Sequence, residues 1–169
     1  MNTTAEQEIA QTPAADSAGP DLTAIARLAR EQARSVLAKL PLLGPVTWLM
    51  MQQGATRHTL ISDLEWRVMP ALMFQQAKLY MRDEAPIAYA SWALLSPETA
   101  LRYRTAPHQL TAADWKSGDE VWLVDLFTPF GGAHEVLSDL RQQVFPGQVI
   151  HQIAPATDGL AEVISWPKG

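Results

Sequence analysis

Apolar and polar positions along this chain predict a sheet flanked by helices. Residues 77–82 and 87–94 are two runs rich in apolar and aromatic side chains, and the polar segment 82–86 separates them. Because two such runs around a short turn typically form a hairpin, we predict an antiparallel pair of strands there. The runs 148–154 and 160–166 have the same character and predict a second antiparallel pair near the C-terminal end.

Apolar residues at three- and four-residue spacing predict the helices. The longest such stripe lies at 22–40 and consists of Leu22, Ile25, Ala26, Ala29, Ala33, Val36, Leu37 and Leu40. Its period is that of an amphipathic helix. The prolines and glycine of 41–45 predict a break at 41–44, and a short helix is expected to follow at 45–52.

Two further helices are predicted around a central strand. Ser96-Pro97 is typical of a helix start, with serine as N-cap and proline at the first helical position, so we expect a helix from Pro97 to about Ala106. Residues 133–145 carry another amphipathic pattern. The predicted order of strands and helices indicates an α/β fold: a mixed, mostly antiparallel sheet flanked by helices.

The length of 169 residues favours one domain. Residues 1–21 have no apolar period and are expected to form a disordered N-terminal tail. Residues 22–40 form an added N-terminal helix, interpreted as a packing or dimer helix, so a homodimer is one form that we consider. Residues 41–169 form the α/β domain.

The strand predicted at 120–127 contains a carboxylate, Asp125, in an otherwise apolar run. Strict alternation would place Asp125 on the face of Val121 and Leu123, opposite Trp122 and Val124. An ionised carboxylate in a buried strand is costly unless it is paired or hydrogen-bonded. Two interpretations follow: a structural carboxylate that pairs with an arginine or caps a loop, or a catalytic acid with a tuned pKa.

Composition excludes several classes of function. The formal net charge of −5 and the absence of a Lys/Arg-rich run argue against nucleic acid as a partner. With no cysteine and only four scattered histidines, neither a disulfide nor a metal site is expected. The sequence contains no run of about 18 consecutive apolar residues, so no membrane-spanning helix is predicted. The N-terminal segment lacks a secretory signal pattern, so we expect a cytoplasmic protein.

Several segments occur in an order that is specific to one family. They are PIAYASWA at 86–93, DWKSGD at 114–119, and WLVD at 122–125 followed by PFG at 129–131. In this order the chain resembles, over about 43–166, the toxin-activating lysine acyltransferases, the HlyC-like enzymes that acylate RTX protoxins. The resemblance implies a GNAT-like domain that transfers a fatty acyl chain to internal lysines of an RTX-type protoxin.

The resemblance also implies the acyl donor. The expected co-substrate is an acyl-carrier protein with a phosphopantetheine-linked acyl chain, and no tightly bound cofactor is expected. The segment 128–132 connects a predicted strand to a helix but lacks the glycine-rich pyrophosphate loop that ordinary GNAT enzymes carry at such a junction. This difference favours a carrier protein over acyl-CoA as the donor.

The family's catalytic pair is a histidine and an aspartate, and Asp125 matches the aspartate. An ungapped register from Trp48 places the family histidine on Thr56, and His58 follows two residues later. A histidine is the natural base near neutral pH, and a carboxylate behind it would orient the ring and offset its charge. His58 and Asp125 are therefore the candidate catalytic residues, with Thr56 and Arg57 as candidate substrate-binding residues.

Three more residues are candidates for substrate binding. Trp92 and Phe130 would supply apolar surface for an acyl chain, and Gly131 would expose backbone N–H groups to a thioester oxygen. Four cations are interpreted as solvated surface charges: Arg57, Arg67, Lys78 and Arg82. The alternative is that they contact the acidic face of a carrier protein. The alternative function is that of a degenerate, non-catalytic relative that binds acyl-carrier protein or another partner but has lost the base.

Overall fold

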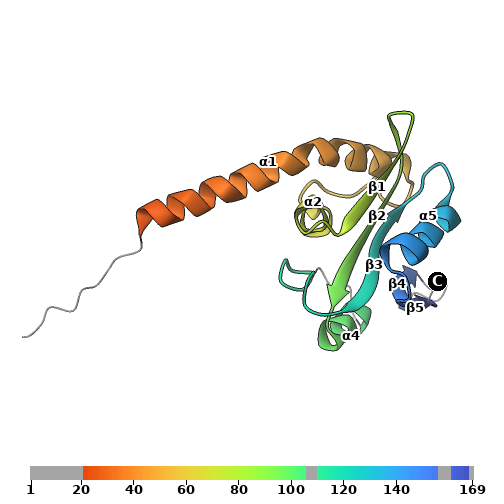
Figure 1. Ribbon diagram of the computed structural model, residues 1–169. Helices are drawn as coiled ribbons and strands as arrows, with labels where there is room; N and C mark the ends of the chain where they lie inside the picture. Colours follow the sequence, from red (N-terminus) through yellow and green to blue (C-terminus); the bar gives the residue numbers. More distant parts are fainter. Residues whose placement is uncertain (1–20, 106–109, 156–160, 168–169) are drawn as a thin grey trace, which may run out of the picture. The chain divides into compact units, whose positions relative to one another are not determined.

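The computed structural model describes residues 21–105, 110–155 and 161–167 (Figure 1). The chain divides into two compact units, Met1–Arg34 and Ser35–Gly169. The described part of the first unit is helical throughout, apart from Asp21 at its start. The tail expected at 1–21 lies outside the described residues except for its last position.

Helix α1 runs from Leu22 to Gln52 without interruption. It includes Pro41 and Pro45, so the break predicted at 41–44 is wrong. Proline disfavours a helix interior because it removes a backbone donor. In the second unit, Val46 and Leu49 at the end of this helix are fully buried in the core, and tertiary packing of this kind regularly overrides local propensity.

A five-stranded sheet in the order β1-β2-β3-β4-β5 forms the centre of the second unit (Figure 1). Its strands are β1 Ala77–Arg82, β2 Ala85–Leu95, β3 Glu120–Phe127, β4 Ile150–Pro155 and β5 Ala161–Trp166. All neighbouring strands pair antiparallel except β3 and β4, which are parallel. The prediction of a mixed, mostly antiparallel sheet is confirmed, and the architecture is consistent with a single GNAT-like domain.

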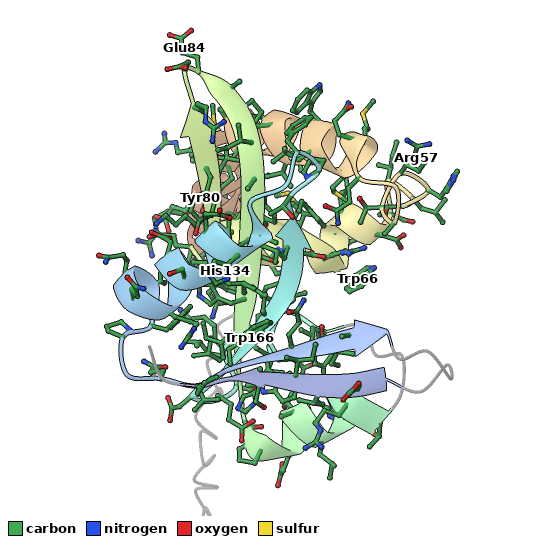
Figure 2. The ribbon with its side chains drawn as sticks, turned by 90° about the vertical axis from the view of Figure 1, so that its right-hand side faces the viewer. Arg57, Trp66, Tyr80, Glu84, His134 and Trp166 are labelled. Carbon is green, nitrogen blue, oxygen red and sulfur yellow. The ribbon has the colours of Figure 1, made fainter. Side chains whose placement is uncertain are left out.

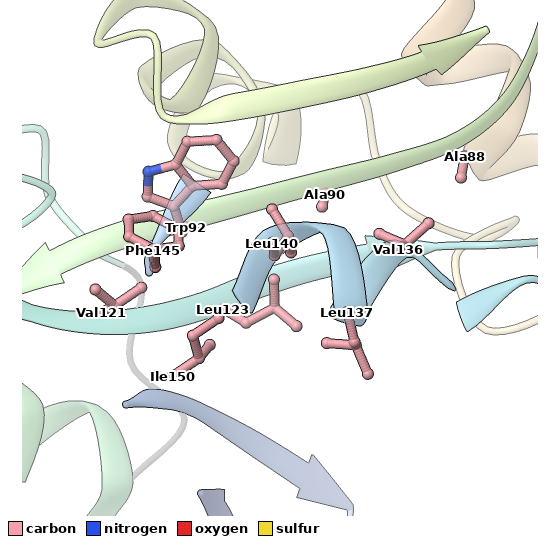
Figure 3. Packing of buried hydrophobic residues seen from close by; sticks show 10 residues of the cluster. All are labelled: Ala88, Ala90, Trp92, Val121, Leu123, Val136, Leu137, Leu140, Phe145 and Ile150. Carbon is pink, nitrogen blue, oxygen red and sulfur yellow. The ribbon is translucent and has the colours of Figure 1, made fainter. Parts of the chain in front are cut away.

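Helices cover both faces of the sheet. Helix α5 (Ala133–Asp139) and the π-helical turn η1 (Leu140–Val144) form the crossover between the parallel strands. They bury one face of β2 and β3, as Figure 3 shows. The end of α1, together with α3 (Met69–Met73), packs against the opposite face. The single α-helix predicted at 133–145 therefore changes to π geometry after Asp139.

Local signals predicted several boundaries correctly. Helix α4 spans Pro97–Thr105, and the backbone N–H of Thr99 donates to Ser96 Oγ at 3.2 Å, which confirms Ser96 as its N-cap. The hairpin turn between β1 and β2 has Asp83 and Glu84 at φ 46° and 68°. Two consecutive positive φ values are typical of the tight turns that join antiparallel strands.

A β-bulge interrupts the pairing of β2 with β3. Ser91 pairs with Asp125, but the next residue, Trp92, pairs with Leu123. Val124 is thus an extra residue on β3 with no partner on β2. A bulge bends its strand and shifts the alternation of side chains beyond it.

The bulge changes the face on which Asp125 lies. Leu123 packs under α5, as alternation predicts, but Leu126 joins the same cluster. Trp122 packs on the other face, and Phe127 is on that face as well. Asp125 therefore shares a face with Trp122 rather than with Leu123, and the assignment from strict alternation is wrong because one inserted residue reverses it.

Gly118 generates a prediction about stability. A Cβ on this residue would lie 2.5 Å from the backbone N and Cα atoms of Ser96. Gly118→Ala should lower the free energy of unfolding by about 1–3 kcal/mol, because overpacking against backbone forces the chain to shift. Gly44 is the matched control: no atom lies within 4 Å of its added Cβ, and Gly44→Ala in helix α1 should be neutral or stabilising. Urea unfolding of both variants is the measurement, and equal stabilities would contradict the close approach.

Candidate functional site

A buried ion pair between Arg67 and Asp125 forms the centre of the candidate site. Arg67 Nε donates to Asp125 Oδ1 at 2.8 Å and to Oδ2 at 3.0 Å, and Arg67 Nη2 also donates to Oδ1. The side chain of Asp125 is 1% exposed and that of Arg67 is 25% exposed. Charge-assisted bonds of this forked type are among the strongest that proteins form.

Helix α2 (Asp63–Arg67) and strands β2 and β3 hold the pair. Arg67 is the last residue of helix α2, and the next residue, Val68, is fully buried. Asp125 follows the bulge on β3. The guanidinium carbon of Arg67 lies 5.7 Å from the centre of the Phe127 ring, and Tyr89 stacks on Phe127 at 5.4 Å. A packed aromatic floor therefore supports the guanidinium from below.

Burial and charge oppose each other at this pair. Burial raises the pKa of Asp125 above its ordinary value, although the hydrogen bonds and charge of Arg67 counteract the shift. Burial lowers the pKa of Arg67, but the hydrogen bonds and charge of Asp125 raise it by more, so the guanidinium stays charged. Burial and the charge of Asp125 raise the pKa of Tyr103 to about 12, and its phenol is therefore protonated at neutral pH.

Two buried hydroxyl groups lie on the strand beside Asp125. Ser91 is the direct partner of Asp125 across β2 and β3, and Tyr89 is two residues before it on the same face. Both side chains are fully buried, and neither Tyr89 Oη nor Ser91 Oγ forms a hydrogen bond of ordinary geometry among the described residues, although the Ser91 hydroxyl lies close enough to oppose the burial that raises the pKa of Tyr89. Unsatisfied buried polar atoms are rare, and their presence next to a buried ion pair marks this part of the core as chemically unusual.

The end of α1 is tied to the end of β3. Gln53 Nε2 donates to the carbonyl oxygen of Leu126 at 3.4 Å, and the backbone N–H of Thr128 donates to Gln53 Oε1 at 3.0 Å. These bonds fix the start of the loop 53–62 beside the strand that carries Asp125. The loop with the candidate histidine therefore begins close to the ion pair.

Thr56 and His58 differ in their surroundings. Thr56 is buried, and its hydroxyl donates to the carbonyl oxygen of Met50 at 2.8 Å, so it fastens the turn that follows α1. His58 is exposed. Arg57 is exposed too, and Figure 2 shows it at the outer side of this loop.

Within the described part of the chain, Arg67 is the only side-chain hydrogen-bond partner of Asp125. Of the two interpretations made from sequence, pairing with an arginine is the one that the structure shows directly. Contact between His58 and Asp125 stays a prediction.

The remaining candidate residues lie in two different places. Trp92 is buried under α5, where its ring meets that of Phe145 edge-on at 5.2 Å (Figure 3). It is on the face of the sheet opposite Asp125. Phe130 is 60% exposed, and its ring lies 5.6 Å from that of Trp48. Gly131, which follows with φ 87°, turns the chain toward α5.

Arg67 and Lys78 are not the solvated surface charges predicted from the sequence, because each forms an ion pair. Arg67 pairs with Asp125, and Lys78 Nζ lies 2.6 Å from Asp139 Oδ2. One signal for Arg67 was available, because the buried position expected for Asp125 requires a partner. The sequence offered no means of choosing that partner among the arginines.

Two further features are absent from the described residues. No group of three or more His, Cys, Asp or Glu side chains is arranged there to hold a metal ion. In the same part of the chain, no helix is sufficiently long and apolar to cross a membrane.

Comparison with known proteins places the site in a family context. The model of the RTX toxin acyltransferase family (HlyC) matches residues 35–166. The protein-lysine myristoyltransferase HlyC of Escherichia coli is 36% identical over 114 residues, which are 68% of this chain and 66% of that protein. The leukotoxin-activating lysine-acyltransferase LtxC of Aggregatibacter actinomycetemcomitans is 37% identical over 112 residues, 66% of each chain.

A third relative, the protein-lysine myristoyltransferase RtxC of Kingella kingae, is 36% identical over 100 residues, 59% of this chain and 60% of that protein. The matches with these relatives therefore span slightly less than two thirds of the relatives' own length. Both the ion pair and the loop with His58 lie within the residues that the family model matches.

The ion pair predicts a large loss of stability when one partner is removed. Arg67→Ala should lower the free energy of unfolding by about 3–5 kcal/mol, because it leaves a buried carboxylate without a counter-charge. Arg27→Ala is the control: Arg27 and Glu31 form an exposed pair at 4.0 Å, and such pairs contribute about 0.5 kcal/mol or less. Urea unfolding decides, and a loss below about 1 kcal/mol for Arg67→Ala would show that the site tolerates an unpaired Asp125.

Proposed function

This chain belongs to the RTX toxin acyltransferase family, and from that premise we propose that it is a protein-lysine acyltransferase acting on an RTX-type protoxin. The observation that carries the proposal is a buried carboxylate, Asp125, at a bulge in the matched segment. The relatives named above are lysine acyltransferases. A buried charge next to a surface loop, here the loop with His58, is also the kind of environment in which functional groups with shifted pKa values occur.

In the proposed reaction, the lysine amine attacks the carbonyl carbon of an acyl thioester. His58 takes the proton from the amine, since an imidazole is a suitable base near neutral pH. The negative charge of Asp125 stabilises the imidazolium after the loop at 54–59 approaches the strand. Thr56 and Arg57 flank the reacting groups on this loop, and the exposed ring of Phe130 with Gly131 contacts the acyl chain.

The proposed donor is an acyl-carrier protein with its phosphopantetheine-linked acyl chain. The segment 128–132 lacks a glycine-rich pyrophosphate loop, so a nucleotide-based donor would have no comparable grip on the chain. A carrier-protein donor would place the reaction in the cytoplasm. A homodimer through α1 also stays a prediction.

A second candidate function is that of a non-catalytic binding module for the carrier protein or another partner. The observation that favours it is the ion pair itself. Arg67 contacts both oxygens of Asp125, while His58 is exposed on its loop. A protein that kept the fold and lost the base would have this arrangement.

The role of His58 is tested by acylation of a purified RTX protoxin with acyl-carrier protein as donor. His58→Ala should slow lysine acylation by about 10²–10⁴-fold, the usual contribution of a general base. His134→Ala is the control, because His134 is also exposed, at the start of α5. Mass spectrometry of the protoxin lysines gives the rate.

Two outcomes would change the proposal. Full activity of His58→Ala would remove His58 from the mechanism while leaving the enzyme assignment intact. If the wild-type chain binds acyl-carrier protein but produces no acyl-lysine, the binding module becomes the better account.

The donor is tested by titrating the wild-type protein with acyl-carrier protein and, separately, with acyl-CoA carrying the same chain. We expect saturable binding of the carrier protein and weak binding of acyl-CoA, because the segment 128–132 lacks a glycine-rich pyrophosphate loop. The carrier protein without its acyl chain serves as control for the protein–protein contact. Tight binding of CoA without any response to the carrier protein would favour a conventional GNAT donor.

A further inference from the structure

Some N–H donors of the Arg67 guanidinium have no hydrogen-bond partner among the described residues. It carries N–H groups on three nitrogens in a fixed fork, and Nε and Nη2 donate to Asp125. Among the described residues, no acceptor hydrogen-bonds to Nη1. The side chain of Arg67 is 25% exposed, whereas that of Asp125 is 1% exposed. The inner edge of the fork is thus bound to a buried anion, and part of the side chain faces solvent.

The position of this guanidinium is fixed before any ligand arrives. The bonds to Asp125 set the plane of the fork, and Phe127 lies beneath it at 5.7 Å. Val68, the residue that follows Arg67, is fully buried and anchors the end of helix α2. Donors that are held in place cost no reorganisation when a charge develops next to them, which is the basis of electrostatic catalysis.

The charges of the pair also suit an acyl transfer. Asp125 neutralises Arg67 overall, so an approaching lysine amine meets no net positive charge. The guanidinium itself stays protonated, because Asp125 raises its pKa. A new negative charge near Nη1 would therefore meet N–H donors that cannot be lost to deprotonation.

We propose that Arg67 stabilises the oxyanion that forms when the lysine amine attacks the acyl thioester, and that Asp125 is its positioning residue. The inference rests on the proposed acyltransferase function. In this inference Asp125 acts through its direct contact with Arg67, whether or not His58 serves as the base.

The bonds and protons balance without a further reactant. As the amine nitrogen bonds to the carbonyl carbon, the π electron pair moves to the oxygen, where Arg67 donates its free N–H groups. When the C=O bond reforms, the C–S bond breaks and the sulfur takes the electron pair. The proton that the amine loses ends on this sulfur, giving an amide and a thiol. Arg67 keeps its own protons throughout.

The kinetic test uses Arg67→Lys, which keeps the positive charge opposite Asp125 but lacks the fork. With acyl-carrier protein and protoxin, kcat should fall by about 10²–10³-fold, the effect of removing one oxyanion donor, with KM little changed. Arg102→Lys is the matched control. Arg102 Nη2 lies 2.7 Å from Oδ1 of the largely buried Asp114, so this variant likewise keeps the charge and removes the fork of an Arg–Asp pair, and its kcat should not change.

A binding test separates the role of Arg67 from a loss of folding. The double variant Arg67→Gln/Asp125→Asn removes both charges together, and its fold is checked by thermal unfolding. Dodecyl phosphonate, which carries an anionic tetrahedral group, should bind the double variant and Arg67→Lys about tenfold or more weakly than wild type. Neutral dodecanol is the control and should bind all three proteins equally.

The outcomes separate the two proposals. If wild type acylates the protoxin while Arg67→Lys keeps its kcat and its phosphonate affinity, the role of Arg67 is overturned and the acyltransferase function stands. If the wild-type protein does not acylate the protoxin, the proposed acyltransferase function fails, and the role of Arg67 in stabilising an oxyanion fails with it. Phosphonate binding that depends on Arg67 would then show an anion site without the reaction.

Discussion

The ion pair of Arg67 with Asp125 is the interaction on which the centre of this structure depends. A carboxylate that is 1% exposed loses its hydration on folding, and only a well-aligned counter-charge offsets that cost. The forked contact meets this requirement. It also joins helix α2 to strand β3, so two elements far apart in the sequence are fixed against each other at this point.

The bulge at Val124 makes the pair geometrically possible. Without the extra residue, Asp125 would face α5, where the neighbouring side chains are apolar. With it, Asp125 faces the side of the sheet on which α1 and α3 pack. The same shift brings Phe127 under the guanidinium. One inserted residue therefore determines the partner of Asp125 and places the Phe127 ring against that partner.

The same residues of this site are compatible with two functions, that of an acyltransferase and that of a non-catalytic binding module. Gln53 holds the loop with His58 beside the end of β3, as an acyltransferase would require. Arg67 meanwhile hydrogen-bonds to both oxygens of Asp125. If Arg67 supplies an oxyanion donor, the ion pair is part of the catalytic apparatus. If it does not, the pair is a structural replacement for a catalytic arrangement.

The sequence by itself determined the elements whose signals are local. The strand at 120–127, the strand at 77–82 and the Ser96 cap were all predicted correctly, because alternation, turn residues and capping act over a few neighbouring positions. The family resemblance indicated Asp125 in the same way, from a short motif. These features need no knowledge of what the chain packs against.

Only the tertiary structure decided the remaining features. Helix α1 continues through Pro41 because its end is buried in the core, and the face of Asp125 depends on a pairing register with β2. Its partner, Arg67, is 58 positions away in the chain. A buried charge requires a counter-charge, but the sequence does not state which one. That choice is made by packing between distant segments, where the geometry of several elements must agree at once.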